Sequence, residues 1–317
     1  MRRRQFTYHL GALTADRDTP FMPRFHSHTV AIAQVLIASA ILAVGDGISK
    51  HLGQHYPVTE FVSVRMWTFL VFVLWFAHRQ RGIRNALRST QPVKQVLRSS
   101  LWCLEIVVFA SALTTITLAE AHALFAIYPL VVTLLAVPIL GERVGWRRIV
   151  SVAIGFVGAL LIIRPGVIQI EIGTALILLA MLMWCGYQLL TRLLSAREHF
   201  ETNLLYMALI GSVIVPLSPV GGPWIWPTAT DALWMLALST TSLIGHMLLV
   251  AALTRAPAST LQPFNFSIMV FAIGVGYVAF GDLPDGYTLL GAAIIVSASL
   301  YVLARERQHQ SDAGRPD

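Results

Sequence analysis

The sequence predicts an all-α integral membrane protein with ten transmembrane helices. Apolar residues make up 56% of the 317 residues, charged residues make up only 12%, and the mean hydropathy is +0.68. A soluble domain carries about 25% charged residues, so lipid covers most of this surface. The 23 Lys and Arg residues lie almost entirely between long apolar runs. The pI of about 9.8 therefore reflects orientation in a membrane, and no basic patch interleaved with aromatic residues indicates nucleic acid as a partner.

Ten apolar segments are long enough to cross a bilayer, because a spanning helix needs about 20 mostly apolar residues. They cover residues 29–49, 60–77, 97–115, 119–140, 147–164, 172–191, 203–220, 232–252, 259–280 and 286–303. Short connections, such as residues 165–171, predict that consecutive helices are antiparallel neighbours.

The positive charges predict the orientation of these segments. With the N-terminus in the cytoplasm, 20 of the 23 Lys and Arg residues fall on the cytoplasmic side, Arg98 among them. Only Lys50 and Arg164 fall outside, and Arg65 lies within the second segment. Because Lys and Arg are enriched in cytoplasmic connections, both termini are expected in the cytoplasm, and the number of spans is even.

An internal repeat appears at a spacing of 140 residues. Residues 112–114 (Ala-Leu-Thr) recur as residues 252–254, and Gly141-Glu142 recurs as Gly281-Asp282. The first Gly-acid loop is rich in arginine and the second has none, so the two copies face opposite sides of the membrane. This predicts two inverted five-helix repeats, an arrangement that places a binding site near the midplane of many transporters. The expected divisions are a basic tail (1–28), the two repeats (29–166 and 167–304) and a polar tail (305–317).

Motifs in the first half carry a family signal. They are Ala112-Leu113, Leu118–Ala121, Pro129–Ala136, Gly141–Arg148, Gly155–Gly158 and Arg164–Gly166. The chain resembles the bacterial drug/metabolite transporters with two EamA repeats, in the branch that includes S-adenosylmethionine uptake carriers. The likeness covers residues 30 to 303, although Asp282 replaces the usual Glu and Met269 stands at the place of Pro129. The resemblance implies a ten-helix carrier that works by alternating access.

Three ionisable residues lie near the outer ends of their segments: Asp46, Arg65 and His122. An ionisable group inside a membrane is costly, so it generally faces a cavity and has a partner. We interpret the three as an outer polar cluster that binds a charged substrate or forms an outer gate. The alternative is a structural salt bridge between Asp46 and Arg65.

Two further ionisable residues are candidates for proton coupling. Glu105 lies within the third segment, where an apolar environment favours a carboxyl that holds a proton. His246 in the eighth segment falls one residue from the repeat counterpart of Glu105. The alternatives are a neutral Glu105 that is hydrogen-bonded to a neighbouring helix, and a His246 in an interhelical hydrogen bond.

Uncharged polar residues predict an inner counterpart of the outer cluster. Gln188 corresponds in the repeat to Asp46, and Gln262 corresponds to His122. Asn265 lies one turn beyond Gln262. We interpret these three amides as a second, weaker gate on the inner side.

Aromatic residues and a proline complete the candidate substrate site. Trp184 and Tyr187 lie deep in the sixth segment, where the alternative for tryptophan is a role as membrane anchor. Tyr128 and Pro129 lie in the fourth segment. Proline leaves a backbone carbonyl without its helical partner, so this carbonyl can face a substrate, and the alternative is a simple kink.

The sequence lacks enzyme signatures. It has two cysteines, no HExxH, no GxSxG, no P-loop and no CxxC, so we expect no enzyme, no cofactor and no metal. The expected function is secondary transport of a small organic metabolite across the bacterial inner membrane. Candidate substrates are an amino acid or a derivative such as S-adenosylmethionine, and the alternative is export of amphipathic cations or drugs. More remote alternatives are an enzyme acting on a lipid-linked substrate and a non-transporting scaffold. Membrane lipid is the other expected partner, and the oligomeric state is open.

Overall fold

The computed structural model describes residues 24–80, 82–140, 146–164, 172–195, 198–218, 223–253, 255–256, 261 and 264–313. Within these residues every regular element is a helix. The helices are α1 (Arg24–Leu52), α2 (Val58–Gln80), α3 (Ile83–Ala86), α4 (Pro92–Leu113), α5 (Leu118–Phe125), α6 (Tyr128–Leu140), α7 (Trp146–Ile163), α8 (Ile172–Ser195), α9 (Phe200–Ile214), α10 (Ala229–Leu253), α12 (Ser267–Phe280) and α13 (Gly286–Ala313).

The helices have the length and composition of a membrane protein. Five are long and apolar enough to cross a membrane: Thr29–Leu52, Val58–Gln80, Pro92–Leu113, Ile172–Thr191 and Ala229–Ala252. The other predicted segments correspond to shorter apolar helices. Large apolar side chains lie exposed on the outside of the bundle, such as Val71 (70%), Val270 (65%) and Val278 (84%). A surface of this kind suits contact with lipid. The predicted all-helical, apolar class is therefore confirmed.

The fourth predicted segment is two helices, so the prediction of one continuous helix over 119–140 is wrong. α5 ends at Phe125 and α6 begins at Tyr128. Pro129 has no N–H, so the carbonyl of Phe125 lacks the amide that would continue the ladder. Pro129 instead occupies the first turn of α6, where a proline costs no intrahelical hydrogen bond.

Other boundaries differ from those predicted. α9 ends at Ile214 rather than at residue 220, because Pro216 follows closely and helices end near the residue before a proline. α1 begins at Arg24 and α13 continues to Ala313, so both reach into the segments predicted as tails. Much of the start of the ninth predicted segment lies outside the described residues.

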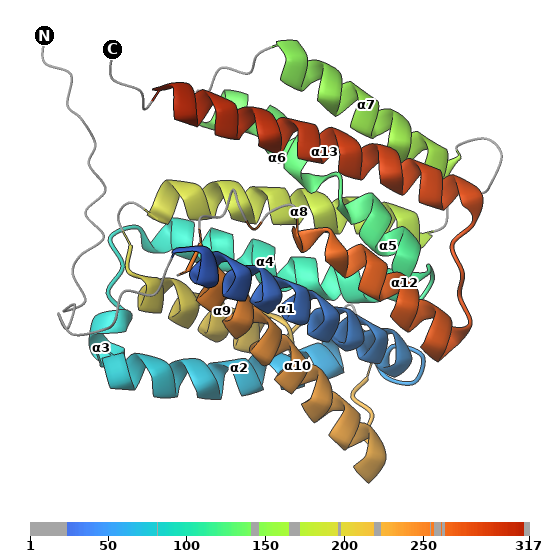
Figure 1. Cartoon of the computed structure of the whole chain (residues 1–317). Coiled ribbons are helices and arrows are strands. Elements are labelled where there is room, and N and C mark those ends of the chain that lie inside the picture. Colours follow the sequence, from blue (N-terminus) through green and yellow to red (C-terminus); the bar gives the residue numbers. More distant parts are fainter. Residues whose placement is uncertain are drawn as a thin grey trace, which may run out of the picture.

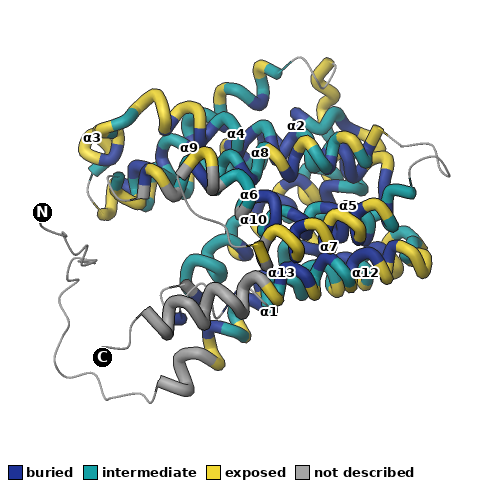
Figure 2. The backbone as a smooth tube through the Cα atoms, turned by 90° about the horizontal axis from the view of Figure 1, so that it is seen from above, coloured by how far each residue is buried: buried dark blue, intermediate teal, exposed yellow. Residues whose placement is uncertain are grey.

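Helices from the two halves of the chain interleave (Figure 1). α1 packs against α10 and α12, and α8 packs against α4 and α6. α2 packs against α9 and α10, α4 against α9, and α7 against α13. Buried residues lie along the faces where these helices meet, and exposed residues lie on the outward faces (Figure 2). The largest core cluster accordingly contains residues from both halves, among them Leu124 and Ile295.

Ion pairs join the two halves at one end of the bundle, here called the Lys50 end. Lys50 Nζ lies 2.8 Å from Asp282 Oδ2 and donates to the carbonyl of Ile116 (3.2 Å). It also lies 4.9 Å from the centroid of the Phe280 ring. A second pair, Arg164 with Asp285, joins the end of α7 to the connection before α13.

Hydrogen bonds join the halves at the opposite end, here called the Arg98 end. Glu198 Oε1 accepts from Ser89 Oγ (2.9 Å), from the amide and hydroxyl of Thr90 (2.8 and 2.7 Å) and from the amide of Gln91 (3.1 Å). These groups precede α4, so the carboxylate stabilises the start of that helix. Partial burial acts to raise the pKa of Glu198, but the hydrogen bonds from Thr90, Ser89 and Gln91 outweigh it and lower the pKa below its ordinary value of 4.5.

We expect Glu198→Ala to lower the unfolding temperature in detergent at neutral pH. A carboxylate with a lowered folded-state pKa stabilises the fold above its ordinary pKa, and this contribution is lost as the pH falls through the folded-state value. The difference between wild type and variant should therefore shrink from pH 6 to roughly pH 3.5. Glu201→Ala, in the first turn of α9 three residues later, is the matched control. An equal difference at both pH values would contradict the role of the charge.

Candidate functional site

A cavity of about 490 Å³ lies at the centre of the bundle and is here called the central cavity. Its volume is within the usual range of small-molecule sites. Side chains from α1, α2, α4, α5, α6, α8, α10 and α12 line it. Nine of the twelve predicted site residues are among them: Asp46, Arg65, Glu105, His122, Tyr128, Trp184, Gln188, His246 and Asn265.

The other three predicted residues lie elsewhere. Tyr187 lines a second cavity, which adjoins the first. Pro129 lies in the first turn of α6, next to Tyr128. Gln262 lies outside the described residues, so the inner group of amides is represented by Gln188 and Asn265.

Asp46 pairs with His122. Asp46 Oδ2 lies 3.1 Å from His122 Nε2, and this contact joins α1 to α5. The proposed alternative, a salt bridge between Asp46 and Arg65, is wrong. Asp46, Arg65 and His122 all line the central cavity, but the described contacts of Asp46 include an ion pair with His122 and none with Arg65.

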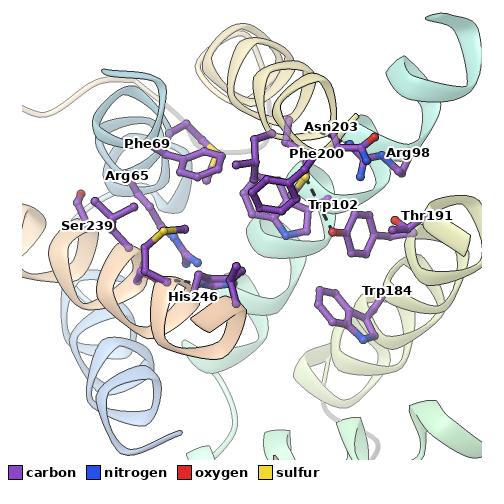
Figure 3. Close-up of a pocket in the computed structure, with 18 residues that line it drawn as sticks. Arg65, Phe69, Arg98, Trp102, Trp184, Thr191, Phe200, Asn203, Ser239 and His246 are labelled. Carbon is purple, nitrogen blue, oxygen red and sulfur yellow. Dashed lines mark hydrogen bonds between the residues drawn. The ribbon is translucent and has the colours of Figure 1, made fainter. Parts of the chain in front are cut away.

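Arg65 lines both cavities and makes no hydrogen bond or ion pair with any residue that the structure describes. Figure 3 shows its side chain reaching from α2 into the pocket, toward His246. A guanidinium carries five N–H donors and cannot lose its charge in a protein. These donors are therefore available to an anionic group of a ligand.

Glu105 lies on α4 and is 6% exposed. It lines the central cavity, and it makes no hydrogen bond with another described residue. His246 Nδ1 lies 2.8 Å from the carbonyl of Ser242, which is on the same helix. Neither residue forms the interhelical hydrogen bond considered as an alternative, as far as the described residues extend.

Aromatic rings form one wall of the central cavity, with Trp184 in the middle. Its ring centroid lies 6.2 Å from that of Phe125, 6.3 Å from that of Tyr128 and 5.2 Å from that of Tyr187. Phe109 continues the wall, in edge contact with Phe125 at 5.4 Å. Such a wall can stack a planar group or attract a cation.

The second cavity, of about 220 Å³, adjoins the central cavity, and Arg98 is among the residues that line it (Figure 3). The two share Arg65, Trp102, Trp184 and His246. Among the described residues that line the second cavity there are two arginines and a histidine, and no Asp or Glu. We call it the arginine cavity.

Arg98 and Trp102 line the cavities but were not among the predicted site residues. The charge count placed Arg98 at the cytoplasmic surface, but it lies in α4 and is 1% exposed. The spacing of polar and aromatic residues along the third predicted segment could have indicated that Arg98 faces the cavity. Arg98, Trp102, Glu105 and Phe109 follow one another at intervals of four, three and four residues, which places them on one face of a helix.

The EamA-like transporter family matches the chain twice, over residues 29–164 and 171–304. The chain belongs to the EamA-like transporter family. The resemblance inferred from the sequence motifs is thereby confirmed, and with it a multi-pass membrane transporter as the class of protein.

Several named relatives of this EamA-family chain are transporters. A S-adenosylmethionine uptake transporter of Rickettsia bellii is 23% identical over 289 residues, which cover 90% of this chain and 97% of the relative. A riboflavin transporter of Rhizobium johnstonii is 32% identical over 256 residues, which cover 78% of this chain and 82% of the relative. A pseudopaline exporter of Pseudomonas aeruginosa is 29% identical over 276 residues, which cover 84% of this chain and 93% of the relative. A solved structure shares the fold, with a TM-score of 0.59 at 19% identity over 90% of this chain and 99% of that one.

Proposed function

We propose that this EamA-family transporter carries a small organic metabolite across the bacterial inner membrane by alternating access. The observation that carries the proposal is the central cavity, in which Arg65 and Glu105 are without hydrogen-bonding partners among the described residues. The substrate we propose is an amino acid or a derivative of one, S-adenosylmethionine included. Glu105 is the carboxylate that carries a coupling proton.

The packing of the helices supports ten spans in two inverted repeats. The pairs α1 with α10 and α1 with α12 correspond to the pairs α8 with α4 and α8 with α6. The pair α4 with α9 corresponds in the same way to α10 with α2. α1 begins and α13 ends at the same end of the bundle (Figure 1), as expected if both termini are cytoplasmic. The Lys50 end then faces outward and the Arg98 end faces the cytoplasm.

The contacts at the Lys50 end suit an outer gate. The pair of Lys50 with Asp282 joins α1 to the connection after α12, and Asp46 with His122 closes the cavity wall beneath it. Access from outside requires α1 and α12 to separate here. Partly exposed ion pairs contribute about 1 kcal/mol. This is enough to shift the equilibrium between the form that is closed to the outside and the form that is open to it.

Reversal of the charge at this gate should slow transport. We expect Lys50→Glu to lower the transport rate about fivefold, because about 1 kcal/mol is lost from the outward-closed form. The double variant Lys50→Glu/Asp282→Lys should recover most of the rate. Uptake by purified protein in liposomes is the measurement. A double variant no faster than the single one would show that the pair does not act as a gate.

The experiment that tests the proposed function is an untargeted comparison of metabolites inside and outside cells that produce the protein and cells that do not. A class of compound that shifts only in producing cells, and that purified protein then moves into liposomes, supports transport. If no compound shifts, and liposomes loaded with a metabolite extract exchange nothing, the proposed function is wrong.

A second candidate function is the export of amphipathic cations. The aromatic wall and the two carboxylates of the central cavity, Asp46 and Glu105, favour it. The comparison of metabolites distinguishes a metabolite carrier from a cation exporter. If the protein exports cations, the compound that shifts is a monovalent cation without an acid group, and its transport does not depend on Arg65.

A further inference from the structure

Arg98 is buried and, like Arg65, has no ion-pair partner among the described residues. Its Nη2 donates to the carbonyl of Asn203 (2.7 Å), and its Cζ lies 5.7 Å from the centroid of the Tyr187 ring. Its Nε is buried and has no hydrogen-bond partner. Glu198, whose charge acts on Arg98, is already bonded to the groups that precede α4. A buried charge that lacks a counter-charge is costly, so an anion supplied by a ligand would stabilise it.

The arginine cavity brings this side chain together with Arg65. Both line it, and Figure 3 shows them on opposite sides of the pocket, one on α2 and one on α4. His246 lines it as well, and the described lining residues include no carboxylate. The charge that the described residues present to this cavity is therefore positive. The central cavity differs, since Asp46 and Glu105 line it.

One face of α4 connects the two cavities. Arg98, Trp102 and Glu105 lie on it in this order. Arg98 and Glu105 are seven residues apart, or about 10 Å along the helix axis. Trp102 lies between them and lines both cavities, with Trp184 on α8 as the other shared aromatic residue. This face presents a positive group, a flat aromatic surface and a carboxyl group in sequence.

We propose that Arg98 and Arg65 form an anion subsite, and that the substrate is a dipolar molecule with a ring. Its acid group lies in the arginine cavity, its ring lies against Trp102 and Trp184, and its cationic group lies near Glu105. The inference rests on the proposed function and narrows its substrate class. It excludes substrates that carry only a cation and uncharged ring compounds such as riboflavin.

Matched compounds that differ only in a carboxylate test the proposal. Purified full-length protein in liposomes is offered L-tryptophan or tryptamine, and S-adenosylmethionine or its decarboxylated form, with riboflavin as an uncharged compound. We expect the acid-bearing member of each pair to have a kcat/KM at least about tenfold higher than its partner, since one charge-assisted contact separates them. Arg98→Gln should remove this preference, and Arg98→Lys should keep part of it. Lys94→Gln, an exposed residue one turn earlier on α4, is the control that should leave the preference intact.

The ratio within a pair is the decisive readout, because a merely structural role of Arg98 would lower transport of both members equally. Equal transport of acid and amine by the wild type overturns the inference and leaves the proposed function standing. A ratio that Arg98→Gln does not change also overturns it. If neither Arg98 variant folds, the preference of the wild type alone decides. If the wild type moves none of the five compounds, the inference is wrong, and the comparison of metabolites then decides separately on transport.

Discussion

Arg65→Ala should abolish transport while the protein still folds and inserts. Arg65 makes no hydrogen bond or ion pair with a described residue, so its removal breaks no such bond of the folded chain in that part of the structure. A hydrogen bond to a charged group contributes about 1.5–3 kcal/mol. Loss of a two-pronged contact to a substrate acid group would therefore lower kcat/KM about a hundredfold or more.

Uptake by protein in liposomes measures this effect, with the amount of folded protein checked by its unfolding temperature. Arg65→Lys keeps the charge but loses the planar fork, so intermediate activity is expected. Arg79→Ala removes an exposed arginine from the same helix and should leave transport unchanged. Normal transport by Arg65→Ala would show that the residue is structural at most.

Gly158→Val should destabilise the fold more than any substitution on the cavity wall. A Cβ at Gly158 of α7 would lie 2.8 Å from the carbonyl oxygen of Gly291 and 2.9 Å from Cγ1 of Ile295, both on α13. Since one of these atoms is backbone, the two helices must move apart. Overpacking typically costs about 1–3 kcal/mol, and a clash with backbone places this change at the upper end.

The unfolding temperature in detergent and the yield of monodisperse protein measure this effect. Gly274→Val on α12 is the matched control, because a Cβ there meets no atom within 4 Å. We expect the control to behave as wild type. If Gly158→Val were equally stable, the close packing of α7 on α13 would contribute little to the fold.

The polar residues of the cavity could be predicted because of their chemistry. Asp46, Arg65 and Glu105 are ionisable groups within apolar segments, and a membrane protein generally directs such groups to an internal cavity. The depth of each side chain in the membrane could also be predicted, since its position along a spanning helix fixes it. The partners of these groups could not be predicted, because they depend on the rotation and tilt of each helix against its neighbours. This is why Asp46 pairs with His122 rather than with Arg65.

Arg98 shows the limit of the charge count. A rule that counts Lys and Arg near the ends of spans treats a buried arginine and a surface lysine alike. Lys94 and Arg98 are one turn apart on α4, yet the first is exposed and the second is buried against Asn203 of α9. Only the position of α9 against α4 distinguishes them.

By itself, the sequence determined the class of protein, the family and the ionisable side chains of the central cavity. Motifs identify the family, and composition and the placement of charge fix the rest, because water, lipid and the membrane potential act on each segment separately. The tertiary structure alone decided which charges meet, where the fourth segment breaks to line the cavity, and that the arginine cavity exists. These depend on how helices from the two halves pack, and packing is a property of pairs of helices rather than of any one segment.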